Sequence, residues 1–299
     1  MDSIKISVWL AFVVYCLLAS AAWIVTPFGE GASFFERQVI LFAVAGVGAT
    51  AFSRKKLRTA GRRLPWVRMV VAGVSFWGVP ACLIHGTGSG VPSITISATF
   101  ALLPAVVVLV TTIDGTTWGE GDGWGYLVPA LAAFGGILLL LPVGLPESVR
   151  GQLGLTLVFV AVILVAISGV WMHRLMQGVA IAETMFIVCF ANAAFLAICG
   201  LVARDFVGGW AGLRTVLSLS SCVDLIQVIV VFWLLREMQP VRFAARYLVI
   251  PLLTVVEGYV VLRPEVTARM VVGAVLLVGG TVWVLFSKAS DDEVILSLR

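Results

Sequence analysis

Long apolar stretches separated by short polar connections run along the whole chain. Ten of these stretches come close to the length of about 20 residues that an apolar helix needs to cross a bilayer. They are 6–25, 36–53, 67–85, 93–113, 125–142, 153–172, 182–203, 215–235, 241–262 and 268–287. Because the apolar runs are continuous, they do not fit the alternating pattern of a membrane β-barrel. The pattern predicts an all-α polytopic membrane protein with ten transmembrane helices.

The order of the apolar stretches repeats after a shift of about 147 residues, which indicates an internal duplication. This shift lays 96–104 on 243–251, so that two prolines coincide, and it lays Glu36 on Glu183. Each copy holds five stretches, and an odd number of spans forces the two copies to point in opposite directions. We therefore expect two inverted five-helix repeats, 1–145 and 146–299, the second ending in a short cytoplasmic tail.

A slightly smaller shift aligns two glycine pairs, Gly135-Gly136 in the first copy and Gly279-Gly280 in the second. Small residues let helices approach closely in lipid, so both pairs are candidates for helix contacts.

Composition supports the membrane interpretation. Hydrophobic residues make up 61% of the 299-residue chain and charged residues only 12%, which a soluble globule of this size could not bury. The first apolar stretch is followed at once by further spans, so we expect it to be retained as a helix and not cleaved as a signal peptide.

Basic residues set the expected orientation. The connection between the second and third stretches carries a cluster of Lys and Arg from Arg54 to Arg68. By the positive-inside rule, this cluster places both termini in the cytoplasm of a multi-pass protein of the plasma or inner membrane. The net charge of +4 comes mostly from this loop, so the charge does not predict a nucleic-acid partner.

Motifs for chemistry in water are scarce. The five cysteines fall inside the predicted spans without metal-ligand spacing, and no nucleotide-binding motif is present. The polar loop from Asp114 to Gly125 contains Asp114, Glu120 and Asp122, which could bind a cation or form only a solvated connector. The sequence therefore predicts no enzyme activity, no cofactor and no metal, and transport, if active, would be driven by an ion or by exchange.

Three ionisable side chains lie inside predicted spans: Asp224 in the eighth, and Arg246 and Glu257 in the ninth. Such groups are costly in a bilayer and usually face a cavity or a partner. In one interpretation, Asp224 and Arg246 form a structural ion pair. In the other, Arg246 binds an anionic group of a substrate, while Asp224 or Glu257 binds an amine or carries a proton.

Aromatic and amide side chains at mid-span complete the predicted substrate-binding set. Trp77 aligns with Asp224 in the repeat, and Tyr247 follows Arg246 directly. Asn192 and Gln227 are candidate donors to a substrate, and the alternative for both is a hydrogen bond between helices.

The second half of the chain resembles the closing helices of EamA-type members of the drug/metabolite transporter superfamily. The resemblance rests on the proline-centred stretch ending at Pro251, on the turn around Pro264-Glu265, and on the glycine-rich segment 273–280. Proline stands here where the family's turn usually has glycine.

The first half resembles the same module in a more eroded form, with 93–104 and Gly119-Glu120 as its counterparts. Arg37 sits where the family often has an arginine.

The resemblance implies ten helices in two inverted repeats, a substrate cavity near the membrane centre, and alternating access. We expect a secondary transporter that exports small polar or zwitterionic metabolites such as amino acids, with protons as a coupling ion or by exchange. Its partners would be a small-molecule substrate and membrane lipids. The alternatives are an exporter of lipophilic cations and other drugs, a lipid-precursor flippase, and an integral membrane enzyme acting on a lipid-linked substrate.

Overall fold

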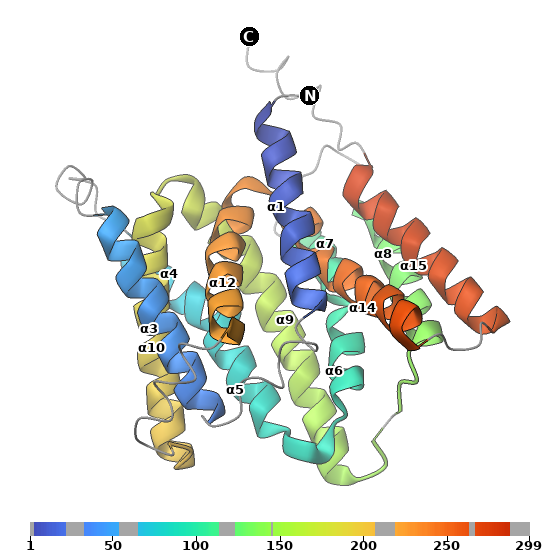
Figure 1. Cartoon of the computed structure of the whole chain (residues 1–299), viewed down its shortest axis with the longest axis horizontal. Coiled ribbons are helices and arrows are strands. Elements are labelled where there is room, and N and C mark those ends of the chain that lie inside the picture. The colour runs from blue at the N-terminus through green and yellow to red at the C-terminus, as the bar shows by residue number, and fades with distance from the viewer. Residues whose placement is uncertain are drawn as a thin grey trace. The chain divides into compact units, whose positions relative to one another are not determined.

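A computed structural model describes residues 3–21, 33–53, 65–113, 123–144, 146–206, 219–262 and 267–287 of the chain. Every regular element within these ranges is helical (Figure 1). The elements are α1 (Ser3–Ser20), α3 (Phe34–Ser53), α4 (Trp66–Gly73), the π-helical turn η2 (Val74–Gly78), α5 (Val79–Gly86), the short 3₁₀ turn η3 (Gly88–Gly90), α6 (Ser93–Phe100), α7 (Leu103–Ile113), α8 (Gly123–Leu140), α9 (Val149–Gln177), α10 (Ile181–Ala203), α12 (Leu219–Glu237), α13 (Pro240–Ala244), α14 (Arg246–Leu262) and α15 (Ala268–Phe286).

The helices confirm the all-α prediction, and several of them are suited to a membrane. A helix or an interrupted helix lies within the described part of each of the ten predicted stretches. Among the residues that the structure describes, six helical stretches are long and apolar enough to cross a bilayer, and two apolar helices, Ile6–Ser20 and Gly125–Leu140, are shorter. The six are Trp66–Gly86, Ser93–Ile113, Val149–Gln177, Ile181–Ala203, Pro240–Val261 and Ala268–Phe286. The count of ten spans stays a prediction.

The chain divides into two compact units. Unit 1 comprises Met1–Gly86 and Trp171–Gln239, and unit 2 comprises Thr87–Val170 and Pro240–Arg299. Each unit thus combines helices from both halves of the sequence, and the boundary falls inside the continuous helix α9. The proposed repeats, 1–145 and 146–299, are therefore not themselves the compact units, and their inverted relation stays a prediction.

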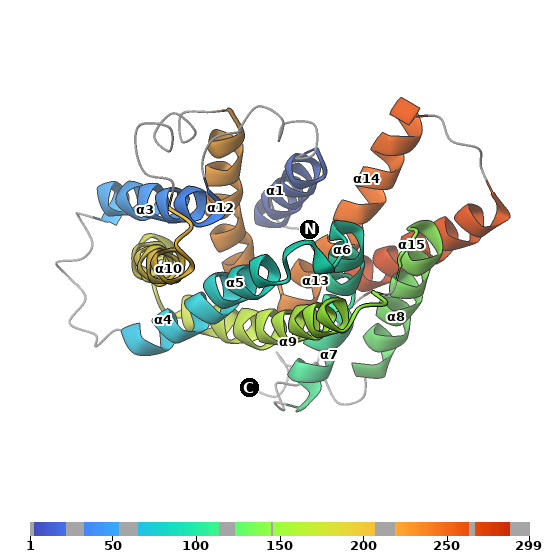
Figure 2. The same cartoon turned by 90° about the horizontal axis from the view of Figure 1, so that it is seen from below.

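In unit 1, α10 packs along α3 and beside α4, while α1 packs on α12. Figure 2 shows α10 nearly end-on, with α3 beside it. The contact between α10 and α4 is close, since a Cβ added to Gly73 would lie 2.5 Å from a methyl group of Val188. A glycine at this position therefore allows the two helices to approach.

The end of α9 supplies hydrogen-bond donors to the end of α12. His173 Nδ1 lies 2.7 Å from the carbonyl oxygen of Leu235, and Gln177 Nε2 donates to the carbonyl oxygen of Arg236 over 2.8 Å. The last carbonyls of a helix have no donor within that helix, so these two side chains satisfy groups that would otherwise need another partner. His173 thus caps a neighbouring helix.

In unit 2, α8 packs along α15, and Figure 1 shows the two helices side by side. A Cβ added to Gly136 would lie 2.5 Å from the carbonyl oxygen of Gly273, and one added to Gly280 would lie 2.3 Å from that of Pro129. Both distances are to backbone atoms of the facing helix. The prediction that these glycines mark helix contacts is therefore confirmed for Gly136 and Gly280.

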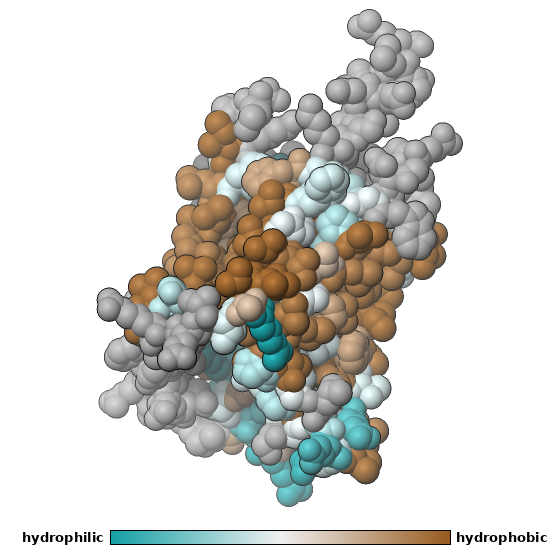
Figure 3. All heavy atoms as spheres, turned by 90° about the vertical axis from the view of Figure 1, so that its right-hand side faces the viewer, coloured by the Kyte–Doolittle hydropathy of each residue, from teal (hydrophilic) through white to brown (hydrophobic). Residues whose placement is uncertain are grey.

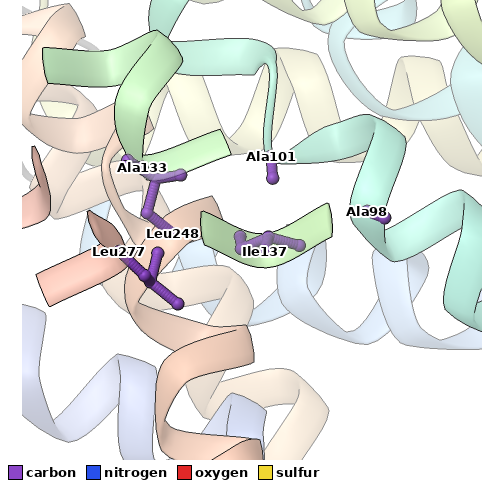
Figure 4. Close-up of a cluster of buried hydrophobic side chains, with 6 residues drawn as sticks. All are labelled: Ala98, Ala101, Ala133, Ile137, Leu248 and Leu277. Carbon is purple, nitrogen blue, oxygen red and sulfur yellow. The ribbon is translucent and has the colours of Figure 1, made fainter. Parts of the chain in front are cut away.

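Small and branched side chains fill the space behind this contact (Figure 4). The cluster draws on α6, α8, α14, α15 and the turn after α6, and its members are at most 1% exposed. They are Ala98, Ala101, Ala133, Ile137, Leu248 and Leu277.

Prolines in unit 2 release carbonyls that side chains from elsewhere then satisfy. Pro129 has no N–H to donate to the carbonyl of Gly125, and Trp283 Nε1 donates to that oxygen over 3.1 Å. Pro142 likewise cannot donate to the carbonyl of Leu138, to which Arg269 Nη2 donates over 3.1 Å. Both carbonyl oxygens therefore have a hydrogen-bond donor. A carbonyl in a lipid environment needs one, because no water is available to it.

Three of the predicted spans are interrupted. The fourth breaks between α6 and α7, and the ninth breaks at Ala245 between α13 and α14. The third widens into the π-turn η2, in which Val79 N–H donates to the carbonyl of Val74; the next residue, Pro80, lacks an N–H of its own. Arg246 directly follows the break at Ala245 and lies inside the candidate span Pro240–Val261.

The outer side of α15 is apolar, and Figure 3 shows a largely hydrophobic surface on the side of the molecule that carries this helix. Val272, Val275, Trp283 and Phe286 are all more than half exposed there. An exposed apolar face of this kind suits contact with lipid chains. The residues through which α15 packs on the protein lie on the other face of the same helix.

Candidate functional site

The first group of candidate residues lies in unit 1 and centres on an ion pair. Arg37, in the first turns of α3, donates through Nη2 to Oδ2 of Asp224 in α12, over 2.5 Å. The two side chains are 26% and 28% exposed. Asp224 therefore pairs with Arg37, whereas one of the two interpretations of the sequence had paired it with Arg246.

Gln227 lies three residues after Asp224, on the same side of α12. Its Nε2 is buried and, within the described part of the chain, makes no hydrogen bond. Arg37 Nε is buried without a hydrogen bond in the same sense. An amide and a guanidinium near one ion pair thus retain donors that a small polar ligand could use.

Trp77 belongs to an aromatic cluster that we define as Phe42, Phe76, Trp77 and Phe232, contributed by α3, η2 and α12. The Trp77 ring centre lies 4.4 Å from that of Phe76, 4.9 Å from that of Phe232 and 6.2 Å from that of Phe42. Phe232 follows Asp224 by eight residues, so the cluster and the ion pair lie about 12 Å apart along α12. The Trp77 ring is therefore packed among three other aromatic rings.

Asn192 is fully buried in α10 and joins two helices. Its Nδ2 donates to the carbonyl of Gly73 over 3.2 Å and to that of Val188 over 2.9 Å. The hydrogen bond to Gly73 reaches the residue that precedes the π-turn. Of the two predicted roles for Asn192, the hydrogen bond between helices is the one that the structure shows.

We expect Asn192→Ala to lower the stability of the protein by about 1 kcal/mol, because hydrogen bonds between membrane helices contribute about that much. Thermal unfolding of the purified protein, followed by tryptophan fluorescence, measures the change. Thr156→Ala is a suitable control, since that exposed hydroxyl only bonds back to Gln152 in its own helix. Equal melting temperatures for Asn192→Ala and the wild type would contradict the role given to Asn192.

The second group lies in unit 2 and centres on Arg246, whose 3% exposure makes it the most buried of the predicted charged site residues. Its Cζ lies 3.6 Å from the ring centre of Phe243 and 4.6 Å from that of Tyr247, and Nη2 donates to the Tyr247 hydroxyl over 3.2 Å. Tyr247 in turn stacks on Phe100 at 5.4 Å. Aromatic faces stabilise a cation in this position.

The electrostatics at Arg246 favour an anion. Arg246 follows the turn at Ala245 that separates α13 from α14, and the N–H groups of Leu248 and Val249 are bonded to the carbonyl of Ala245. The positive charge at this position is therefore that of the guanidinium itself.

Glu257 lies eleven residues after Arg246 in the same helix and is half-buried. This spacing corresponds to about 16 Å along the axis. The Arg246 guanidinium packs on Phe243, which precedes it, and so points away from Glu257. The structure thus brings Arg246 and Tyr247 together and separates Glu257 from the guanidinium.

Other predicted features lie outside the described residues: the basic loop 54–64, the carboxylates of 114–122, and the turn at Pro264-Glu265. Within the described ranges, no three His, Cys, Asp or Glu side chains gather as metal ligands would.

Sequence reasoning missed the neighbours of the site residues. Phe232, Phe243 and Phe100 look like ordinary lipid or core residues in the sequence, and nothing in the apolar pattern distinguishes them. Arg37 could have been recognised from the sequence, because a basic residue at the start of an apolar stretch usually pairs with an acidic side chain or faces a cavity.

The comparisons with known proteins support the fold and give no function. The chain is similar to a crystal structure described only as that of a protein, with a TM-score of 0.70 and 18% sequence identity. The similarity covers 94% of this chain and 99% of the other. No protein-family model and no curated protein matches the sequence. At this identity, the likeness shows a shared fold.

Proposed function

We propose that the protein is a secondary transporter that carries small polar or zwitterionic metabolites, amino acids among them, across the plasma or inner membrane by alternating access. The observation that carries this proposal is Arg246, a cation that is 3% exposed inside a candidate membrane span. Ionisable residues in such positions are rare and commonly mark the path of a substrate or an ion.

Arg246 is assigned to the carboxylate of the substrate. A guanidinium presents a planar set of donors that matches a carboxylate. The rings of Phe243 and Tyr247 hold the guanidinium in place. Tyr247, through its hydroxyl, positions the guanidinium.

Asp224 is assigned to coupling. Protonation of its carboxylate would remove the negative charge that pairs with Arg37. The loss of this ion pair would let α3 and α12 move relative to each other, so binding of a proton could change the structure of unit 1. Glu257 is a second candidate proton site. The Arg246 guanidinium points away from Glu257, so we do not assign Glu257 to the amine of a small substrate bound at Arg246.

Contacts in unit 2 support the proposed inverted duplication. Gly136 lies against Gly273 and Leu277, while Gly280 lies against Pro129 and Ala133. The shift that aligns the glycine pairs relates Pro129 to Gly273, Ala133 to Leu277, and Gly136 to Gly280. If each residue of the Gly136–Gly273 contact is replaced by its equivalent in the other copy, the result is the Gly280–Pro129 contact, which is also present. An interface across a two-fold axis has this property.

A second contact has the same property. Phe100 and Tyr247 coincide under the shift of about 147 residues, and their rings stack on each other. Residues related by a two-fold axis meet each other only beside that axis. This observation supports two inverted five-helix repeats and, with them, the ten-span topology. The cytoplasmic location of the termini rests on the basic loop between the second and third stretches. Export as the direction of transport follows from the resemblance to EamA-type transporters.

The test begins with ligand identification. The purified protein is screened by thermal shift against amino acids and other small zwitterions, because a ligand stabilises the state that it binds. Uptake of the best ligand into proteoliposomes is then measured under a proton gradient.

In this assay, Arg246→Ala should reduce uptake by about 10-fold or more, the equivalent of losing a hydrogen bond to a charged group. Arg242→Ala is the matched control, one turn earlier, because Arg242 Nη2 donates to the carbonyl of Ser287 at the end of α15. The control should transport normally. Full uptake by Arg246→Ala, with wild-type melting behaviour, would remove Arg246 from the substrate site.

A further inference from the structure

Two cysteines that are distant in the sequence meet in unit 1. Cys82 in α5 and Cys199 in α10 are partly exposed, and their thiols are in hydrogen-bonding contact. We propose that Cys82 and Cys199 form a reversible disulfide that links α5 to α10. Neither residue takes part in the proposed transport site.

The packing of the two helices explains why the thiols meet. The segment α4–η2, which continues into α5, packs on α10, and the two chains advance in the same direction along this contact. Gly73 meets Val188 and Asn192, and Gly78 next meets Asn192 and Phe195.

One further turn along each helix brings Cys82 level with Cys199. Because Gly73 and Gly78 admit α10 closely, side chains as short as cysteine can span the remaining gap. Thiols already in contact need only a small approach and a rotation to reach the S–S bond length of about 2.05 Å.

The other cysteines are poorly placed for a similar bond. Cys16 and Cys189 are buried, and Cys222 is exposed on α12. Cys189 lies ten residues before Cys199 on the same helix and is 0% exposed, so it serves as an internal comparison.

The oxidation takes the form of thiol–disulfide exchange with a low-molecular-weight disulfide such as oxidised glutathione. The thiolate of one cysteine attacks a glutathione sulfur, forms a mixed disulfide and releases one glutathione thiol. The second cysteine attacks the mixed disulfide, closes the Cys82–Cys199 bond and releases the second glutathione. The two protons lost by the cysteines are taken up by the two glutathione thiolates.

The proposed topology adds a reason for the pair. Both cysteines lie four residues from the end of their helices, α5 and α10, at the end that would face the outside. Disulfides form and persist on that side of a membrane. The bond would tie α5 to α10 just beyond the π-turn and hold the two helix ends together.

The experiment uses the full chain in detergent, incubated either with oxidised glutathione or with a reducing agent. The reaction is quenched with acid, the protein is denatured, and all free thiols are alkylated with N-ethylmaleimide. Intact mass then counts alkylated thiols, and peptide mapping identifies the partners. We expect all five cysteines to be alkylated after reduction, and a loss of two adducts after oxidation, with a peptide linking Cys82 to Cys199.

Three variants sharpen the result. Cys189→Ser should keep the crosslink. Cys82→Ser and Cys199→Ser should each abolish it and leave the remaining partner alkylated or bound to glutathione. Retention of all five adducts after oxidation, glutathione adducts without a crosslink, or a bond to Cys222 would each overturn the proposal. None of these outcomes depends on transport. The disulfide proposal and the proposed function are therefore tested independently of each other.

Discussion

Gly280→Ala and Gly136→Ala are each expected to destabilise the protein by about 1–3 kcal/mol, the usual cost of forcing an extra methyl group into a packed contact. The new Cβ at residue 280 would lie 2.3 Å from the carbonyl oxygen of Pro129. At residue 136 it would lie 2.5 Å from the carbonyl oxygen of Gly273 and 2.6 Å from the amide nitrogen of Leu277. No side-chain rotation can relieve a clash with backbone atoms, so α8 and α15 would have to move apart.

The chain contains its own controls, because each critical glycine follows another glycine. A Cβ at Gly135 or Gly279 would meet no atom within 4 Å. Alanine favours a helix over glycine by about 1 kcal/mol, so Gly135→Ala and Gly279→Ala should be neutral or slightly stabilising. Melting temperatures of the four variants in one detergent measure the difference. Equal losses in all four would show that close approach is not the role of Gly136 and Gly280.

The second large effect concerns the ion pair in unit 1. Asp224→Asn and Arg37→Gln should each lower stability by about 1–3 kcal/mol, because each leaves one charge in an apolar helix without its partner. The usual cost for a fully buried pair is higher, and the exposed fractions of 26% and 28% reduce it here. The double variant Arg37→Gln/Asp224→Asn removes both charges and should recover most of the loss.

A double-mutant cycle on these three proteins measures the coupling between Arg37 and Asp224. Glu237→Gln provides a matched control on the same helix, because its pair with Arg236 is more exposed and longer, at 3.6 Å. That change should cost less than about 1 kcal/mol. If the two single losses simply add in the double variant, the pair does not contribute as an ion pair.

Much of the fold was predictable because membrane helices leave a simple signal. Uninterrupted apolar runs located the helices from α1 to α15. The breaks within helices could not be predicted in the same way. Whether a proline breaks a helix depends on whether the carbonyl that it leaves without a donor finds a hydrogen bond elsewhere in the fold. Pro80 sits beside a π-turn, whereas Pro129 stays inside α8 and its released carbonyl is satisfied by Trp283 from another helix.

The candidate site was predictable only in part. Charged residues in apolar stretches stand out, so Asp224, Arg246 and Glu257 were found from the sequence. Their partners depend on which helices pack together, which the order of helices along the chain does not give. Arg37 was consequently not assigned to Asp224.

The pairing of α8 with α15 and of α3 with α10 also has a consequence for how the protein is made. Helices leave the ribosome in order, and α8 emerges well before the glycine-lined face of α15 exists. During synthesis, the small-residue face of α8 must therefore wait in the bilayer against lipid or another early helix. Each half of the sequence supplies surfaces that only the other half can cover, so folding of both units is completed late in translation.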